Sequence, residues 1–323
     1  MPTCPLRVSA FMEKHATDKA PIGLEAGSSC LALTRKLRQA GFRVHAFDTR
    51  QVSKFLAIRQ NKTDANDARG IADVVRMGRG VVAEVYIKSA ECQQLRSKLA
   101  IRQKLVRHRM AGESAIRSAF RLNSGRLDRC FSAVDLRRKV TAELERIRDV
   151  EGVDLIDDVM PLLSICEATR KHLEVSDRKL NKLAQRHPIC GRFMEIPGVG
   201  FLTALSVYSA IENPSRFVRN EDAGAYFGLV PRVRQSGQSI QRLGISKMGN
   251  TMTRSHLITA ASVLMRLKDA DCDLQDWAKA LAARADSRRA RTALARKLAV
   301  TMLSMWRSGN PFKARALSEP LDP

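Results

Sequence analysis

The sequence has no closely spaced cysteine pair and no long apolar run. Its seven cysteines are scattered, and none belongs to the C-x-x-C pair that zinc sites and redox motifs use. This pattern argues for reduced intracellular thiols and against a disulfide framework. No apolar segment approaches the roughly 18 residues of a membrane span, and no signal peptide is recognisable. We therefore expect a soluble cytoplasmic protein.

Acidic and aromatic residues are also scarce. Among 323 residues, 56 are Lys or Arg and 33 are Asp or Glu, which gives a net charge of +23. An excess this large indicates a polyanionic partner, and nucleic acid is the common one. Because aromatic residues make up only 5% of the chain, base stacking on aromatic platforms is not the expected mode of binding.

Short apolar segments alternate with helical patterns in the first part of the chain. The predicted elements are a helix at 6–15, a strand ending at Glu25, a helix at 28–41, a strand at 44–47, a helix at 51–60, a helix from Asp64 and a further strand at 81–87. Alternating strands and helices are typical of a parallel α/β layer. A buried strand that stops at a carboxylate and a glycine, as at Glu25, often ends at a site.

The segment Asn61–Ala68 carries two carboxylates at helical spacing. Either Thr63 or Asp64 is suited to cap the helix that follows. Asp64 and Asp67 stand three residues apart and so project from one face, where a hard divalent cation such as Mg²⁺ or Mn²⁺ would relieve their repulsion. Lys62 beside them could contact a phosphate. The alternative is that the two carboxylates only complement the helix dipole.

The middle of the chain is helical and strongly basic. Between Arg96 and Lys139 we count thirteen Lys or Arg and three acidic residues. A solvated charged face is one explanation, and a surface that follows a phosphate backbone is the one we favour. Farther on, Val159, Cys166, Leu173 and Leu180 fall seven apart. This heptad spacing predicts either an antiparallel helical hairpin or an oligomerising coiled coil.

Two glycine-containing segments stand out after residue 188. Gly198 and Gly200 separate two short apolar helical patterns, which resembles a helix-hairpin-helix whose open amides could bind a phosphate, although a plain helix–helix turn fits equally. Ser236 precedes a glycine in a stretch without acidic residues. A serine needs activation to act as a nucleophile, and Ser-Gly is also a common turn between strands. The basic residues around it could bind a phosphodiester: Arg232, Arg234, Arg242 and Lys247.

Four motifs in one order resemble the insertion-sequence-110 transposases, also called the 116 and 902 group. They are Gly23–Gly27, Asn61–Ala68, Ile196–Gly200 and Gly228–Gly237. Each is weak by itself, but four in the right order and spacing are specific. The resemblance extends from about Ile22 to Phe312.

The resemblance implies a fold of class α/β plus α in three parts. Residues 1–88 would form a partial ribonuclease-H or RuvC-like layer of the DEDD type, residues 89–187 a basic helical coiled-coil region, and residues 188–323 a mainly α C-terminal transposase domain with the helix-hairpin-helix-like motif. Glu25 matches the second acidic position of the DEDD site, and Asp64 and Asp67 match the third and fourth. Ser236 matches the serine that attacks DNA, and 244–250 match the basic segment after it.

The family likeness also implies an activity and partners. The expected reaction is metal-assisted phosphodiester transesterification with a serine nucleophile, using Mg²⁺ or Mn²⁺. The expected partners are double-stranded DNA of the element and its target, a structured guide RNA, and further copies of the chain in a dimer or tetramer whose two domains meet in one composite site. Such an enzyme would act in the bacterial cytoplasm, associated with the nucleoid.

The chain departs from the family in its first strands. The first carboxylate of the DEDD set has no match, so the chain resembles an N-terminally truncated member. Asp18 is not on a strand pattern, and Asp48 is better explained as a helix cap. Lacking the first ligand and the strands around it, the chain as given is expected to be poorly soluble and inactive. Two alternatives therefore stay open, a Holliday-junction-type nuclease and an inactive nucleic-acid-binding remnant.

Overall fold

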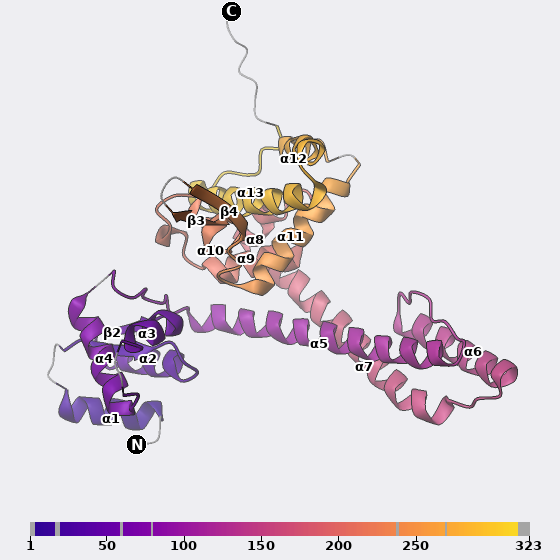
Figure 1. Ribbon diagram of the computed structural model, residues 1–323, viewed down its shortest axis with the longest axis horizontal. Helices are drawn as coiled ribbons and strands as arrows, with labels where there is room; N and C mark the ends of the chain where they lie inside the picture. Colours follow the sequence, from indigo (N-terminus) through magenta and orange to yellow (C-terminus); the bar gives the residue numbers. More distant parts are fainter. Residues whose placement is uncertain are drawn as a thin grey trace, which may run out of the picture. The chain divides into compact units, whose positions relative to one another are not determined.

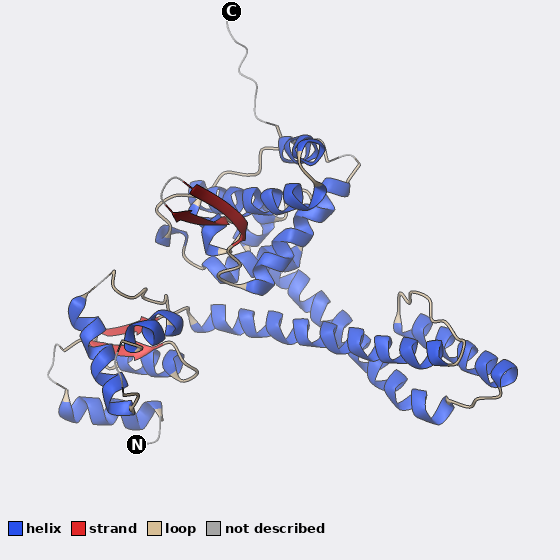
Figure 2. Ribbon diagram, in the orientation of Figure 1, coloured by secondary structure: helices blue, strands red, loops and turns tan. Residues whose placement is uncertain are grey.

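Two units make up the chain, residues 1–89 and 90–323. The computed structural model describes residues 4–16, 20–58, 61–78, 80–236, 239–268 and 270–315. Within these ranges each unit is mostly helical and holds one two-stranded sheet (Figures 1 and 2). The expected combination of an α/β part and a helical part is confirmed at this level.

The first unit contains a parallel strand pair with helices beside it. Its elements are α1 (Pro5–His15), β1 (Ile22–Glu25), α2 (Cys30–Gln39), β2 (Val44–Phe47), α3 (Thr49–Leu56) and α4 (Asp64–Met77). β1 and β2 pair in parallel, with Ile22 opposite Val44 and Glu25 opposite Phe47. Both strands were predicted from the sequence at these residues, and so was their parallel arrangement.

The prediction of a further strand at 81–87 is wrong. That segment meets β2 through one isolated antiparallel bridge, between Phe47 and Glu84. Two backbone hydrogen bonds flank the bridge, from the amide of Val85 to the Ala46 carbonyl (2.6 Å) and from the amide of Asp48 to the Ala83 carbonyl (3.0 Å), whereas the amide of Ala83 donates to the Gln51 side chain (2.8 Å). The segment therefore crosses the edge of β2 and does not continue the sheet.

Three long helices open the second unit: α5 (Ala90–Leu122), α6 (Ala133–Glu151) and α7 (Ile156–Arg186). α5 and α7 run antiparallel, because Arg102 pairs with Asp177 (2.6 Å) whereas Glu113, farther along α5, pairs with Arg170 (2.7 Å), which lies earlier in α7. A Cβ on Gly112 would lie 2.5 Å from Cys166 Sγ, so this glycine allows the two helices to pack closely.

The heptad side chains lie inside this arrangement. Val159, Cys166, Leu173 and Leu180 are all buried within the chain, at 1–7% exposure. Their burial matches the helical-hairpin alternative of the sequence prediction. Since another copy cannot reach side chains already buried, these four positions do not form an oligomer interface.

The rest of the second unit is a helical bundle with a β-hairpin. Its elements are α8 (Pro188–Phe193), α9 (Phe201–Ile211), the 3-10 turn Pro214–Arg216, α10 (Asp222–Tyr226), β3 (Pro231–Ser236), β4 (Ser239–Ile245), α11 (Thr251–Arg266), α12 (Asp273–Arg284) and α13 (Ser287–Ser308). α13 packs against α11 and α12. Phe193, Leu205, Leu257, Leu298 and Met302 are fully buried in the core between them.

Candidate metal and nucleic-acid sites

Helix α4 begins where the sequence places its cap. Thr63 has extended backbone, and its Oγ1 accepts a hydrogen bond from the amide of Asn66 (3.2 Å). Thr63, and not Asp64, is therefore the N-cap. Asp64 and Asp67 lie in the first turn of the helix, where their charges also complement the helix dipole.

Gly23 controls how closely α4 approaches β1. A Cβ at this position would lie 2.6 Å from Val75 Cγ2 and 2.7 Å from Ile71 Cγ2, so the helix packs directly on the strand backbone. Because side chains alternate along a strand, Glu25 faces the same side of β1 as Gly23. The terminal carboxylate of β1 therefore faces α4.

The helix face that meets β1 continues into the two aspartates. Glu25, Ala68 and Ile71 line one cavity of about 450 Å³. Asp64 stands four residues before Ala68 and Asp67 four before Ile71, so both extend that same face by one turn. The structure thus brings together the elements that carry Glu25, Asp64 and Asp67, at the carboxyl end of β1.

The three carboxylates do not converge on one point. Asp64 is exposed, whereas Glu25 and Asp67 are half-buried. Over the described ranges, no group of three His, Cys, Asp or Glu side chains is close enough to hold a metal ion. The donors are nevertheless all carboxylate oxygens, which is the ligand type that hard divalent cations prefer.

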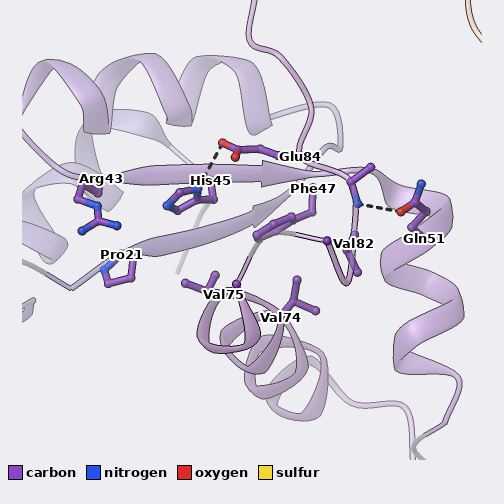
Figure 3. Close-up of a pocket in the computed structure, with 12 residues that line it drawn as sticks. Pro21, Arg43, His45, Phe47, Gln51, Val74, Val75, Val82 and Glu84 are labelled. Carbon is purple, nitrogen blue, oxygen red and sulfur yellow. Dashed lines mark hydrogen bonds and ion pairs between the residues drawn. The ribbon is translucent and has the colours of Figure 1, made fainter. Parts of the chain in front are cut away.

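A larger cavity of the first unit, about 630 Å³, runs along β2 and reaches Phe47 and Gln51 at the carboxyl end of that strand (Figure 3). Phe47 and Val74 contribute apolar lining, and His45 Nδ1 lies 3.3 Å from Glu84 Oε1. Pro21 and Arg43, which precede the two strands, also line it. Glu25, Asp64 and Asp67 are not among the residues that line this cavity, so it is not where we place the metal.

Asp48 and Asp18 are the two acidic residues that the sequence did not favour as metal ligands. Asp48 Oδ1 accepts from the amides of Arg50 and Gln51, each at 3.1 Å, so it caps α3 as predicted. Asp18 lies outside the described residues. Lys62 is exposed just before the cap of α4, at the same end of the helix as the aspartates.

The Gly-x-Gly segment turns the chain between α8 and α9. Gly198 has φ +86°, and a Cβ there would lie 2.8 Å from the Ala260 carbonyl oxygen of α11, so only glycine fits. Gly200 is the N-cap of α9, is exposed, and has no side chain to occupy the first amides. The turn between two helices is as predicted, and phosphate binding by its amides stays a prediction.

His256 on α11 lines the cavity beside this turn, about 520 Å³. Its Nδ1 is buried and has no hydrogen-bond partner. Burial lowers the pKa of His256 to about 4, with a smaller contribution from the positive charge of Arg102. The ring is therefore neutral at physiological pH.

Ser236 is the last residue of β3. It pairs with Ser239, the first residue of β4, in an antiparallel hairpin. In the same hairpin Arg234 lies opposite Gln241 and Arg242 opposite Val233. Ser236 thus lies in a strand, Gly237 lies outside the described residues, and the reactivity of Ser236 stays a prediction.

The loop after β4 is held by two glycines. A Cβ on Gly228 would lie 2.3 Å from the Met248 carbonyl oxygen, and one on Gly249 would lie 2.0 Å from that of Tyr226. Lys247, between them in the chain, has φ +55°, a conformation that a residue with a side chain rarely adopts. Arg232 at the start of β3 and Lys247 are both exposed. Arg254 on α11 was not predicted as a structural residue. Its buried guanidinium donates to the carbonyls of Phe227 and Met248, a role that only the tertiary structure reveals.

Two family models match the chain in this order. Residues 7–122 match a model described as a transposase, the DEDD domain of the IS110 group, and residues 190–275 match one described as the transposase IS116/IS110/IS902 family. The first match contains β1 and α4, and the second contains the Gly-x-Gly turn and the β-hairpin.

Several curated transposases are similar to the chain. The transposase for insertion sequence element IS1111A of Coxiella burnetii is 35% identical over 245 residues, which cover 74% of this chain and 65% of that protein. A probable family 20 transposase of Pseudomonas aeruginosa is 29% identical over 286 residues, covering 85% and 80% respectively. The transposase for element IS1328 of Yersinia enterocolitica is 26% identical over 288 residues, covering 86% and 81%. Among the described residues no helix is long and apolar enough to cross a membrane.

Proposed function

Because the chain belongs to the IS116/IS110/IS902 family of insertion-sequence transposases, we propose that it rearranges the DNA of its element by metal-assisted transesterification. The observation that carries this proposal is the placement of Glu25 at the end of β1, facing the helix side that bears Asp64 and Asp67. A DEDD transposase domain suggests a nuclease that depends on a divalent metal.

Glu25, Asp64 and Asp67 would hold the cation, which we propose to be Mg²⁺ or Mn²⁺. Such a cation polarises a phosphodiester and stabilises the charge that develops during its cleavage. Lys62 would contact the phosphate beside it. A RuvC-like layer for the first unit is part of the same proposal and is supported by the parallel strand pair with α4 packed against β1.

Ser236 is the proposed nucleophile. Its oxygen would form a bond to phosphorus while the phosphodiester loses its bond to one deoxyribose oxygen, and the serine proton would pass to that leaving oxygen. Arg232, Arg234, Arg242 and Lys247 would neutralise the DNA backbone around the serine, and Gly198 and Gly200 would present amides to a phosphate. The basic sequence of the hairpin region and the family membership support these roles.

The net charge of +23 supports nucleic-acid partners beyond one DNA duplex. We include a structured guide RNA and assembly of several copies in the proposal. Since the heptad side chains of α7 are buried within the chain, assembly would use other surfaces.

A Holliday-junction-type nuclease is the second candidate. The position of Ser236 at the end of β3, paired with Ser239, favours it, because serine is common near the ends of hairpin strands for structural reasons. In that case the carboxylates would suffice and water would attack the phosphodiester.

Alanine substitutions separate the metal proposal from a structural role of the carboxylates. In the protein expressed from its complete genomic element, Asp64→Ala, Asp67→Ala and Glu25→Ala should each abolish metal-dependent cleavage of the element's ends and reduce thermal stabilisation by Mn²⁺. Asp73→Ala is the matched control, because Asp73 lies on the opposite face of α4 and pairs with Arg76. If the three variants keep wild-type Mn²⁺ stabilisation and cleavage, the proposed site is wrong.

A further inference from the structure

A groove of about 570 Å³ lies between α5 and the start of α11. Arg96, Lys104 and Arg107 line it from α5, and Asn250 and Thr251 line it from α11. The α5 residues recur at spacings of eight and three, which places them along one helix face. Glu25, Asp64, Asp67 and Ser236 are not among the residues that line this basic groove.

Within the part of the chain that the structure describes, the three cations of the basic groove have no acidic partner. Over the described ranges none of them forms an ion pair, whereas Arg102, on another face of α5, is neutralised by two hydrogen bonds to Asp177. Lys104 and Arg107 are exposed, and Arg96 is half-buried. Like charges brought together without compensation repel each other, and a bound polyanion relieves that repulsion.

On the α11 side of the groove, helix amides and a buried arginine add positive electrostatic potential. Asn250 Oδ1 accepts from the amide of Thr253 (3.0 Å), so the side-chain cap leaves the earlier amides of the helix directed outward. Arg254, 7% exposed, donates to two carbonyls and to Thr251 Oγ1 (3.1 Å), and no carboxylate balances its charge within the described ranges. The close backbone contacts at Gly228 and Gly249 hold in place the loop that precedes α11.

We propose that the basic groove binds the sugar–phosphate backbone of a nucleic acid. The inference deepens the proposed function, on which it rests for the class of partner. From Arg96 to Arg107 the cations span about 16 Å along the helix, a length over which one DNA strand presents about five phosphates. The helix start at Thr251 faces the same backbone from the other wall.

The triple variant Arg96→Gln, Lys104→Gln, Arg107→Gln tests the α5 wall. Binding is measured against salt concentration with a mixed-sequence DNA duplex and with an RNA of the same length. Losing three phosphate contacts should lower affinity and reduce the slope of log affinity against log salt by about 3. The matched control, Lys171→Gln, Arg178→Gln, Lys179→Gln, removes the same charge from exposed positions of α7 and should change the slope by less than 1.

Thr251→Asp tests the α11 wall without weakening the fold. A carboxylate in the first turn favours the helix and still accepts a hydrogen bond from Arg254, but it repels a phosphate. We expect an unchanged or higher thermal midpoint together with weaker binding of both probes. Thr251→Ser should keep wild-type binding.

The outcomes separate this inference from the proposed function. If the wild-type chain binds with steep salt dependence but the triple variant and Thr251→Asp bind like their controls, the basic groove is not a binding site and the proposed function stands. If the wild-type chain binds neither probe, the proposed function itself fails. Weakened binding in both variants, without a lowered thermal midpoint, supports the groove.

Discussion

At Gly23 the absence of a side chain sets the distance between β1 and α4. The neighbouring atoms, Val75 Cγ2 and Ile71 Cγ2, belong to β-branched side chains that have little rotamer freedom. We therefore expect Gly23→Ala to destabilise the first unit by about 1–3 kcal/mol and to lower metal affinity by moving α4 away from Glu25. Urea unfolding, with hydrogen exchange to follow α4, measures the first effect.

Gly27→Ala is the control for this substitution. Gly27 has ordinary φ, and a Cβ there would meet nothing within 4 Å. Equal stabilities of the two variants would contradict the close packing of α4 on β1.

His256 links acidity to stability. The unfolded chain protonates this residue near pH 6.5, whereas the folded protein keeps the ring neutral until its pKa of about 4. Stability from the neutral ring is therefore complete above pH 6.5 and is lost as the pH falls toward 4, by at most about 3 kcal/mol. His256→Gln should flatten the decline of unfolding free energy in that window.

His172→Gln serves as the comparison, because His172 is exposed on α7. It should leave the pH profile unchanged. A His256→Gln variant that loses stability between pH 6.5 and 4 as steeply as wild type would show that another group controls the acid response.

Among the elements, the α5–α7 hairpin depends on a buried ion pair. Glu113 and Arg170 are 7% and 5% exposed, and Arg170 also donates to the carbonyl of Cys130 (3.1 Å). Arg170→Met leaves the Glu113 carboxylate buried with only the more distant Arg117 (3.5 Å) and Arg109 (3.9 Å). We expect a loss of about 3–5 kcal/mol, measured by denaturant unfolding.

Replacing both partners provides the control. Glu113→Leu combined with Arg170→Met should recover most of the lost stability, since no buried charge remains. Arg137→Met, which breaks the more exposed pair with Glu167, should change stability by about 0–1 kcal/mol. Additive effects of Glu113→Leu and Arg170→Met would contradict direct coupling.

Local sequence signals predicted elements well where the cause is itself local. Thr63 and Asp48 cap helices through bonds to amides two or three residues away, so their roles were readable from the sequence. The prediction of a strand at 81–87 was wrong: the segment meets β2 at one isolated bridge, beside which the amide of Ala83 donates to the Gln51 side chain, a contact that the local apolar pattern does not show. The heptad on α7 left two alternatives, since apolar spacing does not show whether the covering helix comes from the same chain.

The functional sites, too, could be predicted only where the signal is local in the sequence. Residue types identified the carboxylates, but only the fold shows that Gly23 and Glu25 face α4. The basic groove was not predictable as a unit, because Arg96 and Thr251 are far apart in the sequence and meet only through the packing of α5 and α11. The charge count signalled a polyanion partner without locating its surface.

At the scale of the whole molecule, the charge of +23 predicts strongly salt-dependent binding. With six to ten phosphates contacted, affinity for a DNA duplex should fall by about 10³–10⁵ between 50 and 200 mM salt. A binding titration at several salt concentrations measures the slope of log affinity against log salt. A repeat with an uncharged polymer as competitor is the control. Affinity that stays flat over this range would rule out backbone contacts as the source of binding.

We propose above all that this member of the transposase family joins DNA through Ser236. The most direct measurement is mass spectrometry of the protein, expressed from its complete genomic element, after denaturation of its reaction with the element's DNA ends and Mg²⁺. We predict a nucleotide adduct on Ser236 that requires the divalent metal and is absent in Ser236→Ala and Asp64→Ala. DNA cut without any adduct, or an adduct on another residue, would contradict the account.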